Sequence, residues 1–201
     1  MPTPASEQPS PLPALILASS SPYRAEMLER LGLAFSSVTS GIDETAGPDE
    51  SPEALARRLA LDKALHVARQ RPEALVIGAD QVAVLNGRVL GKPGSRERAI
   101  AQIRDMSGNA VEYLSGIALV GPGQQRLDVV STRLQYRQLR QSEIERYVDR
   151  DQPLDCAGGM RSEGLGISLL ESLSSDDPTA LIGMPLIRIA RWLRENGYQI
   201  P

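Results

Sequence analysis

The sequence is short of cysteine, histidine and aromatic residues. Its 201 residues include one cysteine, Cys156, one histidine, His66, and 3% aromatics. A single cysteine excludes an intrachain disulfide framework and any zinc site built from several cysteines. We therefore expect a reduced, cytoplasmic protein. Because aromatic residues are so scarce, aliphatic side chains must fill most of the core.

The sequence also lacks a surplus of positive charge and a long apolar run. Its formal net charge is −3, whereas proteins that bind long nucleic acids usually carry a basic surplus. No apolar run approaches the roughly 18 residues of a membrane span. We therefore expect neither a nucleic-acid nor a membrane partner. Residues 1–13 do not resemble a signal peptide and are expected to be a disordered lead-in to one domain over 14–201.

Short apolar runs alternate with helix signals along the chain. Ser21-Pro22 and Ser51-Pro52 are typical helix starts, with serine as the cap and proline at the first helical position. Strands alternating with helices predict an α/β fold, and long hairpins, one turning at Asn86-Gly87, predict a mixed sheet. Strands are predicted at 14–18, 34–38, 75–85, 88–90, 111–120 and 127–136, and helices at 22–31, 52–70, 95–106, 142–148 and from 185 to a stop at Gly197.

One carboxylate stands inside an apolar strand. Asp80 interrupts the run from Val76 to Val84. An unpaired buried carboxylate is costly, so Asp80 needs either a structural partner or a catalytic or metal-binding role. Neighbouring residues of a regular strand face opposite sides. We therefore expect Asp80 and Gln81 to reach one site only near a strand end or a bulge.

Other polar motifs have both a structural and a functional interpretation. The segment Ser19-Ser20-Ser21-Pro22-Tyr23-Arg24 either simply caps a helix or binds a phosphate through helix amides and Arg24. Lys63, Lys92 and the pair Asp43-Glu44 are either solvated residues or parts of a phosphate and metal site.

The glycine-rich stretch 158–166, which contains Glu163, lacks the spacing of a dinucleotide-binding loop. It forms either an ordinary turn or a close approach to a flat ligand. Nothing local supports a nucleophilic pair of Cys156 and His66, so we expect a buried, inert thiol.

Together and in this order, these motifs resemble the Maf family. The resemblance implies a fold related to inosine triphosphate pyrophosphatases, with an elongated mixed β-sheet flanked by helices and a cleft between two lobes. It also implies metal-dependent hydrolysis of a nucleoside triphosphate between its α- and β-phosphates, often by dimers. The matching segments are LILASSSPYR at 15–24, IDET at 42–45, GADQ at 78–81, GKP at 91–93, MSG at 106–108, DCAG at 155–158, SEGLG at 162–166 and IGMPL at 182–186.

The resemblance assigns roles to individual residues. It implies that Asp80 accepts the proton of the attacking water, and we expect Asp80, with Glu44, to hold Mg²⁺ or Mn²⁺. The positions that match phosphate-binding residues are Ser19, Arg24, Lys63 and Lys92. Homodimer formation is a further expectation of this resemblance.

The residues at two positions distinguish subtypes of the family. Gln81 and Glu163 resemble the subtype that acts on 7-methyl-GTP, whereas the dTTP/UTP subtype usually has threonine and glutamine there. An ionised glutamate accepts hydrogen bonds from the guanine edge, and a carboxylate and an aromatic face, here Tyr23, favour the cationic methylated base. Tyr23 replaces the tryptophan often found in that subtype. The alternatives are a dTTP/UTP pyrophosphatase and a non-catalytic regulator of septum formation that binds a partner.

Overall fold

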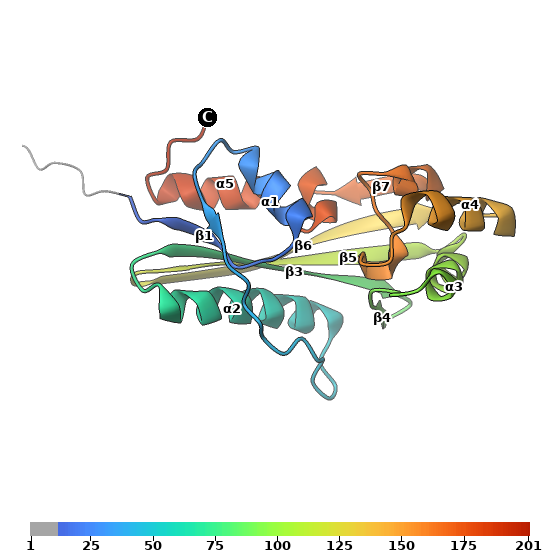
Figure 1. The fold of residues 1–201 in the computed structure, drawn as a ribbon, viewed down its shortest axis with the longest axis horizontal. Helices are drawn as coiled ribbons and strands as arrows, with labels where there is room; N and C mark the ends of the chain where they lie inside the picture. Colours follow the sequence, from blue (N-terminus) through green and yellow to red (C-terminus); the bar gives the residue numbers. More distant parts are fainter. Residues whose placement is uncertain (1–11) are drawn as a thin grey trace, which may run out of the picture.

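A mixed β-sheet runs the length of the molecule (Figure 1). The computed structural model describes residues 12–201, so the lead-in predicted at 1–13 lies almost entirely outside the described residues. Within 12–201 the strand order is β2-β1-β3-β5-β6-β7, and β4 pairs with β3. The strands are β1 (Leu15–Leu17), β2 (Ser36–Ser37), β3 (Leu75–Leu85), β4 (Arg88–Leu90), β5 (Ala110–Gly121), β6 (Gln124–Tyr136) and β7 (Leu170–Ser175). Strand β1 is parallel to β2 and β3 and the other pairs are antiparallel, which confirms the mixed sheet.

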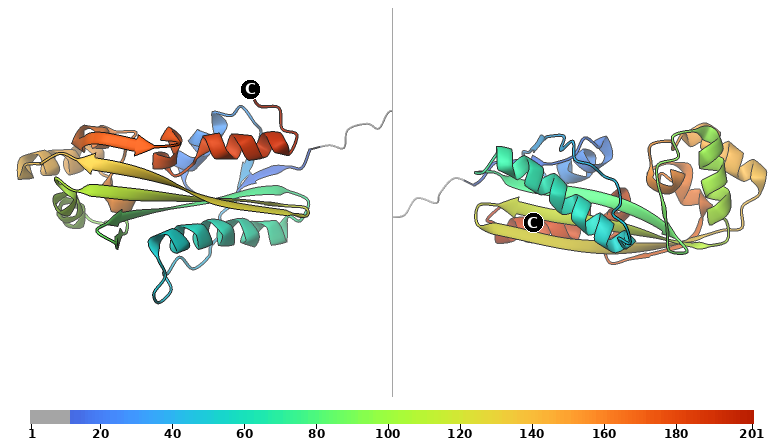
Figure 2. Two further views of the ribbon diagram at one scale, coloured as in Figure 1. Left: turned by 180° about the vertical axis from the view of Figure 1, so that it is seen from behind. Right: turned by 90° about the horizontal axis from the view of Figure 1, so that it is seen from below.

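Helices cover both faces of this sheet (Figures 1 and 2). Helix α2 lies on one face, α1 and α5 lie on the other, and α3 and α4 lie at the far end of the long strands. This arrangement confirms the elongated α/β architecture. The α-helices are α1 (Pro22–Glu29), α2 (Pro52–Gln70), α3 (Arg96–Met106), α4 (Gln141–Asp151) and α5 (Leu186–Glu195), and the 3₁₀ helices are η1 (Ala157–Gly159), η2 (Leu165–Leu169) and η3 (Pro178–Ile182).

Local sequence accounts for most element boundaries. The side chains of Ser21, Ser51 and Ser95 accept hydrogen bonds from backbone amides in the first turns of α1, α2 and α3, as predicted for serine caps. Helix α1 ends at Glu29, two residues before its predicted end. Strand β7 was missed because its sequence, LESLSS, is polar and mostly exposed. No helix in residues 12–201 combines the length and the apolar character that spanning a membrane requires.

The long strands β3, β5 and β6 join two lobes that have separate cores. In the first lobe, formed by β1, β2, α1, α2 and α5, Leu75 and Ile77 pack toward α1 and α5 while Val76 packs against α2. In the second lobe, formed by β4, α3, α4, η1, η2 and β7, the core gathers around Tyr113 and Tyr136. The side chains of β3 alternate between faces, as expected for a strand.

Two glycines let α2 lie unusually close to the sheet. A Cβ atom added to Gly78 would lie 2.1 Å from the carbonyl oxygen of Ala60, and one added to Gly116 would lie 2.2 Å from that of Ala56. The helix presents fully buried alanines to the sheet at these points. Glycine and alanine together therefore set the distance between α2 and β3, and with it the position of every side chain that α2 directs at the cleft.

Candidate active site

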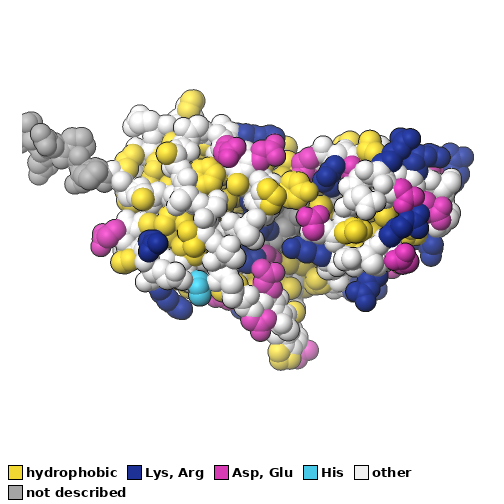
Figure 3. Space-filling model, viewed as in Figure 1, with side chains coloured by type: hydrophobic (Ala, Val, Ile, Leu, Met, Phe, Trp, Pro, Cys, Tyr) yellow, Lys and Arg dark blue, Asp and Glu magenta, His cyan; other side chains and the backbone are white. Residues whose placement is uncertain are grey.

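A cleft of about 670 Å³ opens between the lobes. It forms beside an interruption in the sheet, because β1 pairs with β3 only over residues 75–77 and β4 only over residues 83–85. Both strands lie on the side of β3 that faces away from β5, so residues 78–82 have no strand neighbour there in the described chain. Figure 3 shows acidic and basic side chains around the hollow.

The cleft brings together every site residue predicted from the sequence. They come from β3, α1, α2 and four connecting loops, and their separation in the sequence reaches 144 residues, between Ser19 and Glu163. The predicted residues that line the cleft are Ser19, Tyr23, Arg24, Glu44, Lys63, Asp80, Gln81, Lys92 and Glu163.

A buried lysine joins two carboxylates at the centre of the cleft. Lys63 on α2 donates to Asp80 Oδ1 at 2.6 Å and its Nζ lies 2.7 Å from Glu44 Oε1. The residues Lys63 and Asp80 are 6% and 7% exposed, so this pair is shielded from solvent, while Glu44 is more open. Burial opposes ionisation of Glu44, but the hydrogen bond and charge of Lys63, with further cations nearby, hold its pKa below the usual range.

An arginine and the serine loop form the wall next to this cluster. Ser19 Oγ accepts hydrogen bonds from the Ser21 amide at 3.1 Å and from Arg24 Nη1 at 3.5 Å. Burial lowers the pKa of Arg24, and the negative charges of Asp80 and Glu44 counteract that shift. The guanidinium is thus a desolvated cation at the N-terminal turn of α1, where free backbone amides also favour an anion.

Gly183 accounts for the glycine of the segment 182–186. Its φ of 85° is in the left-handed region, and a Cβ atom there would lie 3.3 Å from Arg24 Nε. Any side chain at this position would therefore strain the backbone and crowd the guanidinium. The turn at 182–186 thus leaves room for Arg24, which only the folded contact shows.

Gln81 faces the opposite side of β3 from Asp80. Its Nε2 donates to the carbonyl oxygens of Ala180 and Leu181 at 3.0 and 2.8 Å and lies 3.1 Å from Ser115 Oγ. These contacts fix which end of the amide is nitrogen. The side-chain oxygen has no partner among the described residues and is not buried, so it remains available as an acceptor in the cleft.

The expectation that Asp80 and Gln81 share a site only near a strand end or a bulge was wrong. The pairing of β3 with β5 is regular through both residues, and both line the cleft. The reason is the missing strand neighbour between β1 and β4. Because the edge of β3 is open there, space above and below the sheet is continuous around that edge.

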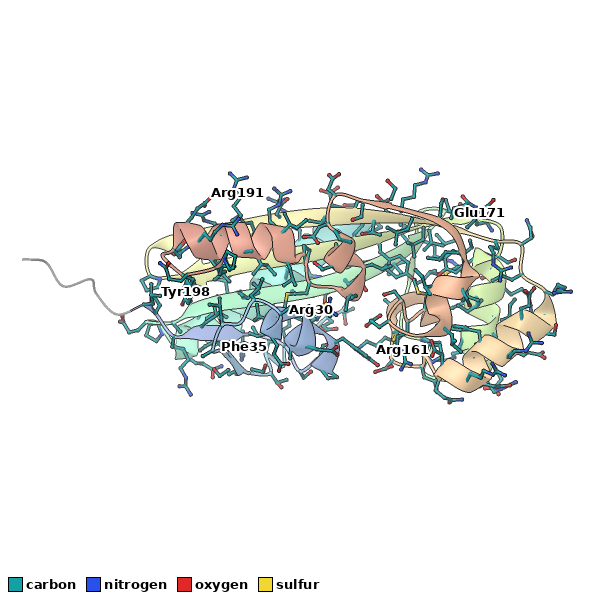
Figure 4. All side chains as sticks on the ribbon, turned by 90° about the horizontal axis from the view of Figure 1, so that it is seen from above. Arg30, Phe35, Arg161, Glu171, Arg191 and Tyr198 are labelled. Atoms are coloured by element: carbon teal, nitrogen blue, oxygen red, sulfur yellow. The ribbon has the colours of Figure 1, made fainter. Side chains whose placement is uncertain are left out.

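A chain of polar contacts links the lobes at the mouth of the cleft. Arg161 lies 3.0 Å from the buried carboxylate of Asp151, whose other oxygen accepts from the Leu165 amide at 2.9 Å. The nearby Tyr23 side chain, followed by the charge of Asp151, raises the pKa of Arg161. Figure 4 shows Arg161 on the part of the second lobe that faces α1. Arg161 and Asp151 were not predicted; the position of Arg161 within the glycine-rich stretch was the only local signal.

The carboxylate of Glu163 is free of cationic partners. It is exposed in the cleft, accepts from Ser162 Oγ at 2.8 Å and has no ion pair with any described residue. Nearby Cys156 also lines the cleft, and burial together with Asp155 and Glu163 raises the pKa of its thiol to about 12. A thiol protonated at neutral pH is a poor nucleophile, in agreement with the expected inert cysteine. The expectation that this thiol is buried was wrong, because Cys156 lies at the wall of the cleft and is only half-buried.

The site offers two carboxylates to a cation. Among the described residues no group of three or more histidine, cysteine, aspartate or glutamate side chains is arranged to hold a metal ion. Mg²⁺ typically binds through one or two carboxylates together with substrate phosphates and waters. The pair Asp80 and Glu44 therefore fits a metal that arrives with a phosphorylated ligand, and does not fit a closed all-protein metal site.

Several named proteins are similar to this chain over nearly its whole length. A protein from Xanthomonas axonopodis pv. citri named 7-methyl-GTP pyrophosphatase is 53% identical over 190 residues, which cover 94% of this chain and all of that protein. Proteins of the same name from Nitrosococcus oceani and Pseudomonas aeruginosa are 51% and 50% identical, covering 96% and 94% of this chain and 98% and 100% of theirs.

A likeness among solved structures is much weaker. The Staphylococcus aureus Ham1 protein gives a TM-score of 0.45 at 17% identity, over 62% of this chain and 72% of that chain, and supports no inference.

The model of the family described as Maf-like protein matches residues 14–196. With relatives of about 50% identity over nearly the whole chain, this match shows that the protein belongs to the Maf family.

Proposed function

We propose that the protein hydrolyses 7-methyl-GTP, or a related non-standard nucleoside triphosphate, to the monophosphate and pyrophosphate. The observation that carries this proposal is that one cleft combines two sets of lining residues. One set contains the cations and carboxylates near Asp80, and the other contains a tyrosine and two hydrogen-bond acceptors. The names of the relatives described above support the same substrate.

The charged region suits a triphosphate. Arg24, Lys92 and the N-terminal turn of α1 would stabilise the negative charge that builds on the attacked phosphorus and on the departing pyrophosphate. Ser19 would add a hydroxyl donor beside Arg24. Because these groups are held by the fold before substrate arrives, they cost little reorganisation at the moment of reaction.

The carboxylates would act on the attacking water. When bound by Asp80 and Glu44, Mg²⁺ or Mn²⁺ would lower the pKa of a coordinated water and offset phosphate charge. Asp80 would accept the proton of that water with its carboxylate, which lines the cleft. Burial between α2 and β3 fixes this carboxylate in one orientation.

The second region suits a cationic purine. The free carboxylate of Glu163 and the open oxygen of Gln81 are both hydrogen-bond acceptors, whereas the N1–H and N2–H₂ edge of guanine presents donors. Methylation at N7 gives the base a positive charge, which Glu163 and the face of Tyr23 would favour. Neutral pyrimidines would not gain from this charge.

Pyrophosphate release from 7-methyl-GTP, GTP, dTTP, UTP, CTP and ATP in the presence of Mg²⁺ tests the proposal. We expect a clear preference for 7-methyl-GTP, with Asp80→Asn losing most activity while keeping its circular dichroism spectrum. Preference for dTTP or UTP would keep the reaction and overturn the assignment of Gln81 and Glu163. If the folded protein cleaves none of them, a regulatory role by partner binding takes its place. Homodimer formation and a cytoplasmic location stay predictions.

A further inference from the structure

We propose that Lys63 occupies, in the free enzyme, the place of a divalent cation between Asp80 and Glu44, and that its ammonium moves to the phosphates when metal and nucleotide bind together. This inference rests on the proposed function. It assigns Lys63 a role beyond phosphate binding, because the lysine would couple the binding of the metal to that of the substrate.

The Lys63 ammonium contacts both candidate metal ligands. Lys63 Nζ lies 2.6 Å from Asp80 and 2.7 Å from Glu44, so one cation bridges both carboxylates that a metal would use. An ammonium has three N–H donors, and two of them are occupied by these carboxylates. The third is free to meet a phosphate oxygen in the cleft that Lys63 lines.

The packing of α2 restricts where the Lys63 ammonium can move. The lysine projects from the stretch of α2 whose backbone lies against Gly78, where Ala60 and Ala64 are fully buried. With its stem held in this way and only 6% of the residue exposed, the ammonium cannot simply swing into bulk solvent when a metal approaches. It needs another anion within reach, and a bound triphosphate is that anion.

The cations around Asp80 and Glu44 oppose the binding of a metal ion alone. Lys63 contacts both Asp80 and Glu44, the charge of Arg24 acts on both carboxylates and that of Lys92 acts on Glu44, whereas the other two carboxylates of the cleft, Asp155 and Glu163, form no ion pair with this cluster. A divalent ion alone would therefore approach two carboxylates whose charge is already offset by neighbouring cations. A metal ion that arrives with a triphosphate brings the negative charge that frees the carboxylates from the ammonium.

Mn²⁺ binding to the whole protein without nucleotide tests the first half of the proposal. Free Mn²⁺ would be followed by electron paramagnetic resonance at pH 8 in wild type, Lys63→Met and Lys92→Met. Lys63→Met should bind Mn²⁺ more tightly than wild type, on the order of tenfold, the scale on which neighbouring groups change metal affinity. Lys92→Met is the matched control: the charge of Lys92 also acts on Glu44, but Lys92 has no ion pair with either carboxylate, so its removal should raise Mn²⁺ affinity clearly less than the removal of Lys63.

Mn²⁺ affinity that is unchanged or weaker in Lys63→Met would overturn the proposal, as would an equal gain in both variants. Lys63→Gln, which keeps a hydrogen-bond donor without the charge, provides a second neutral variant if Lys63→Met fails to fold, and should also bind Mn²⁺ more tightly. Lys63→Arg keeps the charge and should keep the weak affinity of wild type. None of these titrations depends on turnover, so they separate a failure of this inference from a failure of the proposed function.

Binding of a non-hydrolysable analogue tests the second half. The probe is 7-methyl-GTP with a methylene group in place of the α,β-bridging oxygen, measured by calorimetry with Mn²⁺ and with EDTA. If the ammonium moves to the phosphates only when a metal takes the carboxylates, Lys63→Met should weaken analogue binding more with Mn²⁺ than with EDTA. Equal weakening under both conditions would refute the transfer of the ammonium.

Discussion

Replacing Gly78 by alanine should damage both the fold and the active site. The new Cβ atom would lie 2.1 Å from the carbonyl oxygen of Ala60 and 2.8 Å from the amide nitrogen of Ala64. Both contacts are with the backbone of α2, so no side-chain rotation can relieve them. Since a carbon and a carbonyl oxygen approach to roughly 3.3 Å, the helix must move away from β3 by about 1 Å.

The size of the effect follows from this displacement. Overpacking a close-packed interior usually costs about 1 to 3 kcal/mol. For a protein of this length each kcal/mol lowers Tm by about 2 to 4 °C, so the variant should melt about 2 to 12 °C below wild type. The same shift pulls Lys63 away from Asp80, and a misplacement of about 1 Å can lower kcat by about 100-fold.

Thermal unfolding and pyrophosphate release measure the two consequences separately. Gly47→Ala is the matched control, because its new Cβ would meet only the Glu50 side chain at 3.7 Å or more and its backbone is not left-handed. That variant should keep the activity of wild type, with Tm unchanged or slightly raised. A wild-type Tm and kcat for Gly78→Ala would refute the reasoning. A lower Tm with normal kcat would show that close packing stabilises the fold without placing Lys63.

Three further predictions concern other parts of the molecule. Tyr23 lines the cleft and lies near Arg161, so Tyr23→Phe and Arg161→Met should each raise KM for the nucleotide about two- to fivefold, and the double variant should show less than the product of the two effects; independent effects would show that the two side chains act separately. Hydrogen bonds from Arg58 and a backbone amide lower the pKa of Glu50 to about 2, so its stabilisation is present above the unfolded pKa near 4.3 and is lost as pH falls through 2. Glu50→Gln should therefore have a lower Tm than wild type at pH 7 but nearly the same Tm at pH 1, and an equal deficit at both pH values would contradict this linkage. Asp177 is buried and accepts two backbone amides, so in urea titrations Asp177→Asn should lower the free energy of unfolding by about 1 to 3 kcal/mol, whereas an unchanged value would show that these bonds are dispensable.

Several features were predictable because they depend on neighbours in the sequence. Serine caps followed by proline located the starts of α1 and α2, and alternating elements predicted the mixed α/β sheet. Asp80 could be singled out because a carboxylate in an apolar strand needs compensation, and in the structure that compensation comes from Lys63. The ordered motifs of the Maf family then indicated the other predicted site residues.

Periodicity, capping and the order of motifs were therefore enough to predict most element types, the candidate site residues and the family, because they can be seen in the linear chain. The folded chain was needed to show that β3 has an open edge, that Gly78 and Gly116 bring α2 close to it, and that Arg161 lies near Tyr23. These features depend on contacts between segments far apart in the chain. No local pattern encodes them, because the distance between packed elements is set by the combined shape of both surfaces.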